Sequence, residues 1–102
     1  WEFPGGKCEM GETLPECLQR ELFEEVGIVV NVRERVLVTT HAYPKKTIKL
    51  NFFLCQLVSG KPQGLEGQAL AWVDMDTLNC YNFPEADAKM LEKLRQNPCW
   101  WR

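Results

Sequence analysis

Three glutamates are spaced so that their carboxylates could act together in a chemical site. Glu21, Glu24 and Glu25 follow an i, i+3, i+4 pattern, which places side chains on one face of an α-helix. Three carboxylates held together repel one another unless a cation lies among them, and hard oxygen ligands select Mg²⁺, with Mn²⁺ as an alternative. The competing interpretation is a solvated helix face with an ion pair from Arg20 to Glu24, because runs of charge usually face water.

The residues around these glutamates favour the metal site. Residues 6–28 read G-x5-E-x7-R-E-L-x-E-E-x-G-I, a pattern that begins at Gly6, includes Glu12 and ends at Gly27 and Ile28. This stretch resembles the Nudix box, the signature of hydrolases that cleave nucleoside diphosphates linked to another group. The chain is therefore expected to be an enzyme of the Nudix hydrolase family.

The resemblance implies a separate role for each group of residues in the box. The expected metal ligands are box carboxylates and the backbone of two glycines: Glu21, Glu24, Glu25, Gly5 and Gly6. Arg20 would hold the carboxylates by charge-assisted hydrogen bonds, and Glu12 would fix the shape of the loop. The metal would neutralise the substrate's phosphates and activate a water molecule. Attack at the β-phosphorus would give a nucleoside monophosphate and pyrophosphate.

Segments outside the box favour one group within the family. Residues 2–7 read E-F-P-G-G-K, residues 9–12 read E-M-G-E, and residues 83–87 read F-P-E-A-D. They resemble the MutT-like nucleoside triphosphate pyrophosphohydrolases, which include 8-oxo-dGTP diphosphatases and CTP pyrophosphohydrolases, so the implied role is sanitation of the nucleotide pool, a form of DNA repair. Two alternatives stay open. One is hydrolysis of another nucleoside diphosphate derivative, such as ADP-ribose or a dinucleoside polyphosphate. The other is a catalytically silent binding module, although such domains usually lose box glutamates and this one has lost none.

Four more residues are candidates for the site, each with an ordinary alternative. Glu66 matches a family loop glutamate that joins the metal site or acts as a base, and is otherwise an exposed loop acid. Lys7 reaches a phosphate or is a surface lysine. Phe83 stacks on a base or anchors the core. Asp87, where MutT carries asparagine, contacts the base edge or places a negative charge in the first turn of the last helix.

Helices are predicted on both sides of a β-rich stretch. Thr13 to Glu16 fits a capping box with proline in the first turn, and Gly27 is the expected end of that helix. Its predicted buried stripe is Leu14, Cys17, Leu18, Leu22 and Val26. A second helix is expected over residues 85–96, with Ala88, Leu91 and Leu94 facing inward. Residues 74–81 form a helical turn or an irregular link.

The strand pattern gives the fold class. Strand-like runs cover residues 1–3, 28–32, 36–43, 47–58 and 69–73, with a hairpin turn at 44–46. Together with the helices they predict an α/β (α+β) protein, in which a mixed sheet is sandwiched between helices as in the Nudix fold. The chain is expected to be a single Nudix domain over residues 1–102. It is expected to be truncated at its N-terminus, since residues 1–3 already look like the strand that enters the box.

Composition excludes several classes of partner. The net charge of −2 gives no basic face for a nucleic-acid polymer, whereas a small nucleotide can bind through metal ions. No apolar run reaches membrane-spanning length, so no membrane partner is expected. Five scattered cysteines without C-x-x-C spacing favour free thiols in a cytoplasm, and the lone His41 is more typical of a packed or surface residue than of a ligand. The protein is expected to be a monomer or a homodimer.

Overall fold

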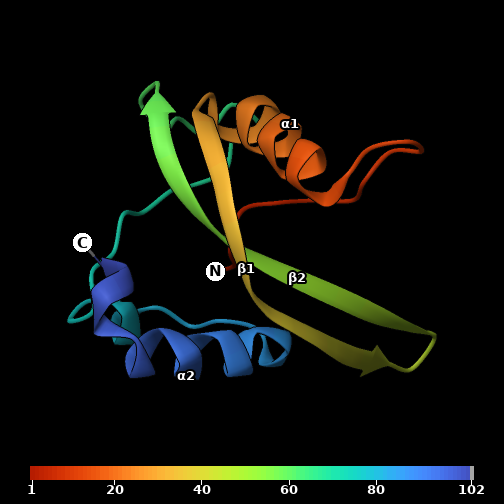
Figure 1. The fold of residues 1–102 in the computed structure, drawn as a ribbon. Helices are drawn as coiled ribbons and strands as arrows, with labels where there is room; N and C mark the ends of the chain where they lie inside the picture. The colour runs from red at the N-terminus through yellow and green to blue at the C-terminus, as the bar shows by residue number, and fades with distance from the viewer. Residues whose placement is uncertain (102) are drawn as a thin grey trace. The chain divides into compact units, whose positions relative to one another are not determined.

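The computed structural model describes residues 1–101, which form two compact units. The α1 unit comprises residues 3–34 and 55–71, and the α2 unit comprises residues 1–2, 35–54 and those from 72 onward. An antiparallel pair of strands, β1 (Val29–Tyr43) and β2 (Lys46–Ser59), contributes to both units (Figure 1). The predicted hairpin turn is confirmed between them.

Helix α1 (Leu14–Val26) begins and ends where the sequence predicts. The Thr13 hydroxyl accepts a hydrogen bond from the Glu16 amide at 3.2 Å, and the Glu16 carboxylate accepts one from the Thr13 amide at 2.9 Å. This reciprocal capping box satisfies two amides that the first turn leaves without helical partners. At the other end Gly27 adopts a left-handed conformation with φ of 73°, and its amide donates to the Phe23 carbonyl.

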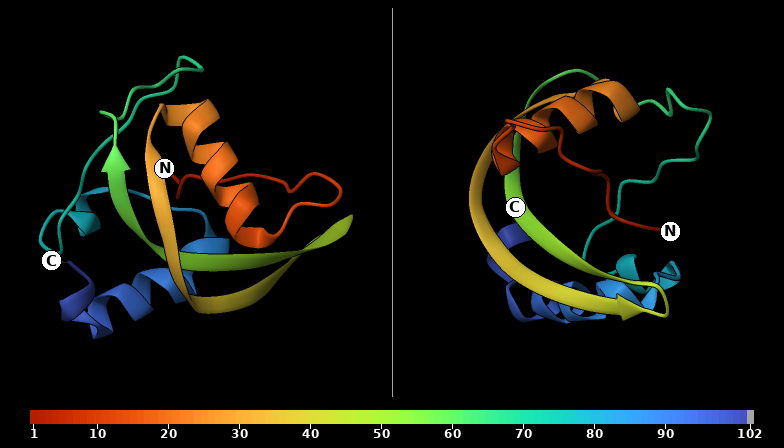
Figure 2. Two further views of the ribbon diagram at one scale, coloured as in Figure 1. Left: turned by 45° about the horizontal axis from the view of Figure 1, so that its top comes forward. Right: turned by 90° about the vertical axis from the view of Figure 1, so that its right-hand side faces the viewer.

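The core of the α1 unit joins α1 to the start of β1 (Figure 2). Its members are apolar residues of both elements and of the link between them: Leu22, Val26, Ile28 and Val30, with Leu18 and Val32 packed against them. Cys17 is also buried, as expected for the predicted stripe. Leu14 is the exception, because it stands at the first helical position and is 37% exposed.

The sheet is simpler than predicted. The runs 28–32 and 36–43 merge into one strand, because pairing with β2 carries β1 through Arg33, Glu34 and Arg35. Residues 1–3 and 69–73 are not strands, so within residues 1–101 the sheet is the antiparallel pair and the mixed character predicted for it is absent. The Trp1 ring instead packs edge-on against the Tyr81 ring, with ring centroids 4.9 Å apart.

The α2 unit contains short helical elements around one longer helix. They are the 3-10 turns η1 (Leu78–Cys80), η2 (Glu85–Asp87) and η3 (Pro98–Trp101) and the helix α2 (Ala88–Gln96). The turn predicted within 74–81 is confirmed as η1, whereas the helix predicted from residue 85 begins with η2. The inward positions differ in detail: Met90 is buried, Leu91 and Leu94 are half-buried and Ala88 is exposed. No helix in the described part of the chain is long and apolar enough to cross a membrane.

Candidate active site

Arg20 organises the acidic residues of the α1 unit. Its guanidinium donates to both Glu12 oxygens, at 2.7 and 3.0 Å, and to the carboxylates of Glu21 at 2.9 Å and Glu24 at 3.1 Å. It also donates to the Lys7 carbonyl at 3.1 Å. The hydrogen bonds expected from Arg20 to the carboxylates are therefore present. Glu12 also accepts a hydrogen bond from the Glu9 amide, so Arg20 and Glu12 together hold the loop before α1. Glu12 was expected to fix the shape of this loop, and these hydrogen bonds agree with that expectation.

Glu21 and Glu25 lie together beneath the glycines of that loop. The Gly5 amide donates to the Glu25 carboxyl group, which also lies within hydrogen-bonding reach of Glu21. A Cβ atom built on Gly6 would overlap the Glu21 carboxylate, so only glycine leaves room for that carboxylate where it lies. Burial raises the pKa of Glu25 above its ordinary value, and the charges of Glu21 and Glu66 raise it further.

The loop that carries Glu66 is fastened to the end of α1. The Gln68 side chain donates to the Glu25 carbonyl at 2.9 Å and accepts from the Glu66 amide at 2.8 Å. The amides of Gln63 and Leu65 donate to the carbonyls of residues 26 and 25. The structure therefore brings Glu66 close enough to Glu25 to raise its pKa. Sequence reasoning missed Gln68, because nothing in a loop glutamine indicates a clamp on a helix 43 residues away.

The donor set fits a hard divalent cation in its chemistry. Carboxylate oxygens are the ligands Mg²⁺ prefers, and the mutual repulsion of Glu21, Glu25 and Glu66 favours a positive charge among them. No group of three or more Asp, Glu, His or Cys side chains within residues 1–101 is drawn together as tightly as a metal site requires. Glu24 is turned toward Arg20, and its side chain is 57% exposed. A cation would therefore need Glu24 or Glu66 to turn toward the Glu21–Glu25 pair.

The α2 unit contains a cavity of about 200 Å³. Its lining residues come from both strands, from residue 2, and from η2 with the proline before it: Glu2, His41, Tyr43, Ile48, Leu50, Pro84, Ala86 and Asp87. The strand residues alternate in sequence, 41 with 43 and 48 with 50, as expected for side chains that share one face of a hairpin. That alternation was available in the sequence, but it does not by itself tell a pocket from a core.

Asp87 is the acidic group in this cavity that is least accessible to solvent. It is 8% exposed, whereas Glu2, the other acidic residue of the lining, is exposed. Burial raises the pKa of Asp87 above its ordinary value, and the charge of Glu2 adds to this. Asp87 precedes α2 but makes no side-chain capping bond, so helix capping does not explain a carboxylate at this position.

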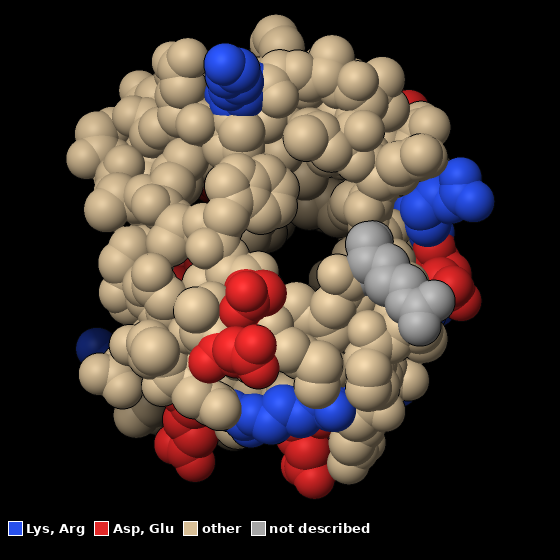
Figure 3. Space-filling view, turned by 90° about the vertical axis from the view of Figure 1, so that its left-hand side faces the viewer, with Lys and Arg blue, Asp and Glu red and all other residues tan. Residues whose placement is uncertain are grey.

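The remaining candidates lie apart from these groups. The side chain of Lys7 is exposed, and only its carbonyl joins the Arg20 network. Phe83 is half-buried and does not line the cavity. His41, by contrast, does line it and packs edge-on against Tyr43, with ring centroids 4.7 Å apart. On the face drawn in Figure 3, Lys and Arg side chains are scattered among acidic ones and form no basic stripe.

Comparison of the sequence with known proteins identifies the family of this chain. Residues 1–93 match the model of the NUDIX domain family. The 8-oxo-dGTP diphosphatase of Haemophilus influenzae is 43% identical over 91% of this chain and 68% of its own length; that of Buchnera aphidicola from Acyrthosiphon pisum is 39% identical over 95% and 78%. The CTP pyrophosphohydrolase of Escherichia coli is 36% identical over 90% and 68%.

Solved structures give the same result. A structure from a study of MutT from Aliivibrio salmonicida and Vibrio cholerae aligns with a TM-score of 0.68 at 36% identity, covering 94% of this chain and 78% of the other. MutT from methicillin-resistant Staphylococcus aureus 252 aligns with a TM-score of 0.73 at 32% identity, covering 95% and 75%. The chain belongs to the NUDIX domain family.

Proposed function

We propose that this protein is a Mg²⁺-dependent, MutT-like nucleoside triphosphate pyrophosphohydrolase that cleaves modified nucleotides to a monophosphate and pyrophosphate. The observation that carries the proposal is the arrangement around Glu25. Its carboxyl group lies within hydrogen-bonding reach of Glu21 and accepts a hydrogen bond from the Gly5 amide. The negative charge of Glu66 raises the pKa of Glu25. Three acidic residues from two separate segments are thus held near one another, and relatives at 39–43% identity are named 8-oxo-dGTP diphosphatases.

The residues of the α1 unit would act on the phosphates. Glu21, Glu24, Glu25 and the backbone near Gly5 and Gly6 would hold Mg²⁺, which would neutralise the triphosphate and activate water. Mn²⁺ offers the same chemistry. Arg20 holds the carboxylates of Glu21 and Glu24 through its hydrogen bonds, and Glu24 would turn away from Arg20 to reach the cation. Glu66 either adds a carboxylate to the cluster or accepts the proton of the attacking water, and Lys7 pairs with a phosphate oxygen.

The cavity of the α2 unit would receive the base. Its lining includes the apolar side chains of Ile48 and Leu50, and Asp87 adds a buried carboxylate. An ionised aspartate only accepts hydrogen bonds, so it suits a donor-bearing edge such as the exocyclic amine of cytosine. Burial raises the pKa of Asp87, which favours a protonated form able to donate to an oxidised purine. Phe83, which does not line the cavity, would stack on a base only after a rearrangement of the segment before η2.

The setting we propose is a reducing cytoplasm, where the protein acts on free nucleotides as a monomer or homodimer. The five cysteines, all within residues 1–101, form no disulfide, which suits a compartment that keeps thiols reduced. The net charge of −2 and the scattered basic side chains on the face drawn in Figure 3 do not suit a nucleic-acid polymer.

The test is hydrolysis of a nucleotide panel in the presence of Mg²⁺. It includes 8-oxo-dGTP, dGTP, CTP, 5-methyl-dCTP, ADP-ribose and a dinucleoside polyphosphate, with products identified by mass. We expect a monophosphate and pyrophosphate from one or more triphosphates. Preferential hydrolysis of ADP-ribose or a dinucleoside polyphosphate would assign another Nudix activity. Failure to hydrolyse any of these compounds would favour a binding module.

A further inference from the structure

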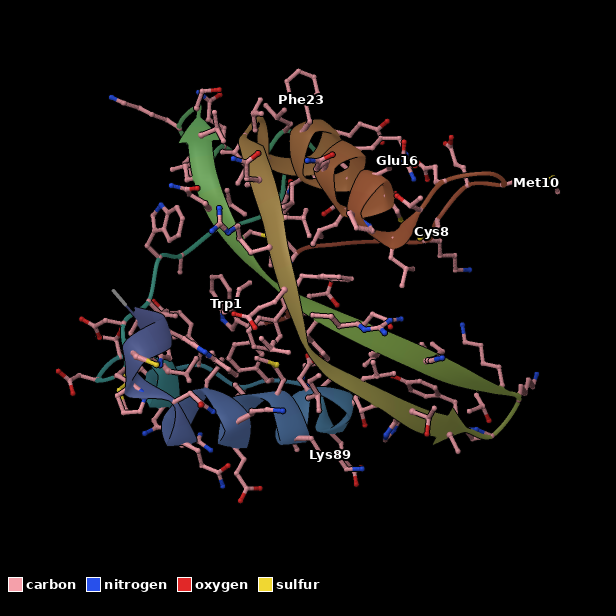
Figure 4. All side chains as sticks on the ribbon, viewed as in Figure 1. Trp1, Cys8, Met10, Glu16, Phe23 and Lys89 are labelled. Atoms are coloured by element: carbon pink, nitrogen blue, oxygen red, sulfur yellow. The ribbon has the colours of Figure 1, made fainter. Side chains whose placement is uncertain are left out.

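Two cysteines face each other where the loop before α1 meets the helix. Cys17 lies in the first half of α1 and is 3% exposed, whereas Cys8 lies in the loop and is exposed. In Figure 4 Cys8 lies beside the first turns of α1, while Met10 at the loop tip points away. The Cys8 thiol lies close enough to Cys17 to raise its pKa, so the two side chains are neighbours in the folded protein.

The backbone on both sides of Cys8 is held in this position. The Lys7 carbonyl accepts from Arg20 at 3.1 Å, and the Glu9 amide donates to Glu12 at 2.7 Å. Arg20 and Cys17 are three residues apart and therefore on the same side of α1. The bidentate Arg20–Glu12 pair thus places the loop so that Cys8 stays over Cys17.

We propose that Cys8 and Cys17 form a reversible disulfide when the protein meets a hydroperoxide, which holds the loop on α1 and protects the exposed thiol from irreversible oxidation. In the first step the Cys8 sulfur attacks the peroxide oxygen, the O–O bond breaks, an alcohol leaves and Cys8 becomes a sulfenic acid. In the second step the Cys17 sulfur attacks the Cys8 sulfur, the S–O bond breaks, and water leaves with the Cys17 proton. Two thiols thus lose two electrons to one peroxide, and a dithiol returns the protein to its reduced state.

The order of the two steps follows from accessibility. A hydroperoxide reaches the exposed Cys8 first, since Cys17 is enclosed. Burial and the neighbouring Cys8 thiol raise the pKa of Cys17 to about 12, so it stays a protonated thiol until the sulfenic acid forms beside it. Because the bond would join side chains that are already neighbours, it should reinforce the native loop rather than displace it.

The test is oxidation of the full chain with one equivalent of hydrogen peroxide, followed by thiol blocking, digestion and mass spectrometry. We expect a mass loss of about 2 Da, a linked pair of peptides containing Cys8 and Cys17, and full reversal by dithiothreitol. Closing a short loop should also raise the unfolding midpoint by several degrees without reductant. Cys99→Ser, which changes another exposed cysteine, should behave like the parent.

Variants of the pair separate this proposal from general thiol oxidation. Cys8→Ser should lose both the link and the rise in midpoint, and its exposed position allows it to fold. With two or more equivalents of peroxide, Cys17→Ala should instead gain about 32 Da at Cys8, which dithiothreitol does not reverse. A linked species between two chains, or oxygen added at Cys8 of the parent with no bond to Cys17, would overturn the proposal. Neither readout depends on nucleotide hydrolysis.

Discussion

Replacing Gly6 with alanine is the sharpest perturbation that the structure offers. An added Cβ would lie 2.9 Å from one oxygen of Glu21 and closer still to two other atoms of that carboxyl group, whereas ordinary contacts begin near 3.4 Å. The backbone itself accepts the change, because Gly6 is not among the glycines with positive φ. The displaced group is the far end of a flexible side chain, so the fold has little to lose. We therefore expect the unfolding midpoint to stay within a few degrees of the parent.

The cost should appear in turnover instead. Relieving the overlap moves the Glu21 carboxylate by roughly 1 Å, and a misplacement of this size in a catalytic site costs about 10²-fold. That corresponds to about 2.7 kcal/mol in transition-state stabilisation. Because Glu21 is also held by Arg20 at 2.9 Å, the shift should disturb the hydrogen-bonding network rather than be absorbed locally.

The assay is kcat/KM for the best triphosphate across a Mg²⁺ titration, beside thermal unfolding. Gly11→Ala is the matched control: its φ is 86°, and a Cβ there meets nothing within 4 Å. Alanine in that conformation costs about 1–2 kcal/mol, so this control should unfold earlier but keep turnover within a few-fold. Gly6→Ala should thus be the more stable of the two variants, and Gly11→Ala the more active. Parent-like turnover in Gly6→Ala would refute the placement of Glu21 in the metal site.

Further predictions concern the base, the loop and the products. Asp87→Asn should change the ranking of cytosine against 8-oxoguanine nucleotides by roughly 1–3 kcal/mol in kcat/KM, and an equal effect on every nucleotide would contradict its role. The same variant should raise the unfolding midpoint at pH 7 and lose that gain below about pH 4, because a raised pKa penalises only the ionised form; a gain independent of pH would argue against it. Gln68→Ala should lower kcat through release of the Glu66 loop while leaving the unfolding midpoint nearly unchanged, whereas unaltered kinetics would mean the clamp is dispensable. Orthophosphate should appear only after pyrophosphatase is added, and its direct release would indicate attack at the terminal phosphorus.

Features that depend on residues of one local motif were predictable from the sequence. The cap at Thr13, the end of α1 at Gly27 and the hydrogen bonds of Arg20 all join residues close in sequence or within one motif. Such contacts depend on spacing and side-chain chemistry alone. The existence of η1 and the position of the hairpin turn follow from local turn residues in the same way.

Features that depend on distant partners were not predictable. Whether residues 69–73 pair as a strand depends on a neighbouring strand, and Gln68 just before them is bound to α1 instead. The continuity of β1 through Arg33 and Glu34 likewise comes from pairing with β2. The residues that line the cavity with Asp87 come from segments far apart in the chain, so the alternation of 41 with 43 suggested a strand face and nothing more.

The measurement that tests the central claim most directly is the Mg²⁺-dependent turnover of Glu25→Gln beside that of Glu34→Gln, an exposed glutamate of β1. The amide keeps the shape of Glu25 but removes the charge that would hold the cation. We predict that turnover falls by about 10²-fold or more. The unfolding midpoint of the metal-free protein should stay the same or rise, since burial and two neighbouring carboxylates disfavour an ionised Glu25. Glu34→Gln should match the parent in both respects. Near-normal Mg²⁺-dependent turnover in Glu25→Gln would contradict the assignment of this cluster as the catalytic metal site.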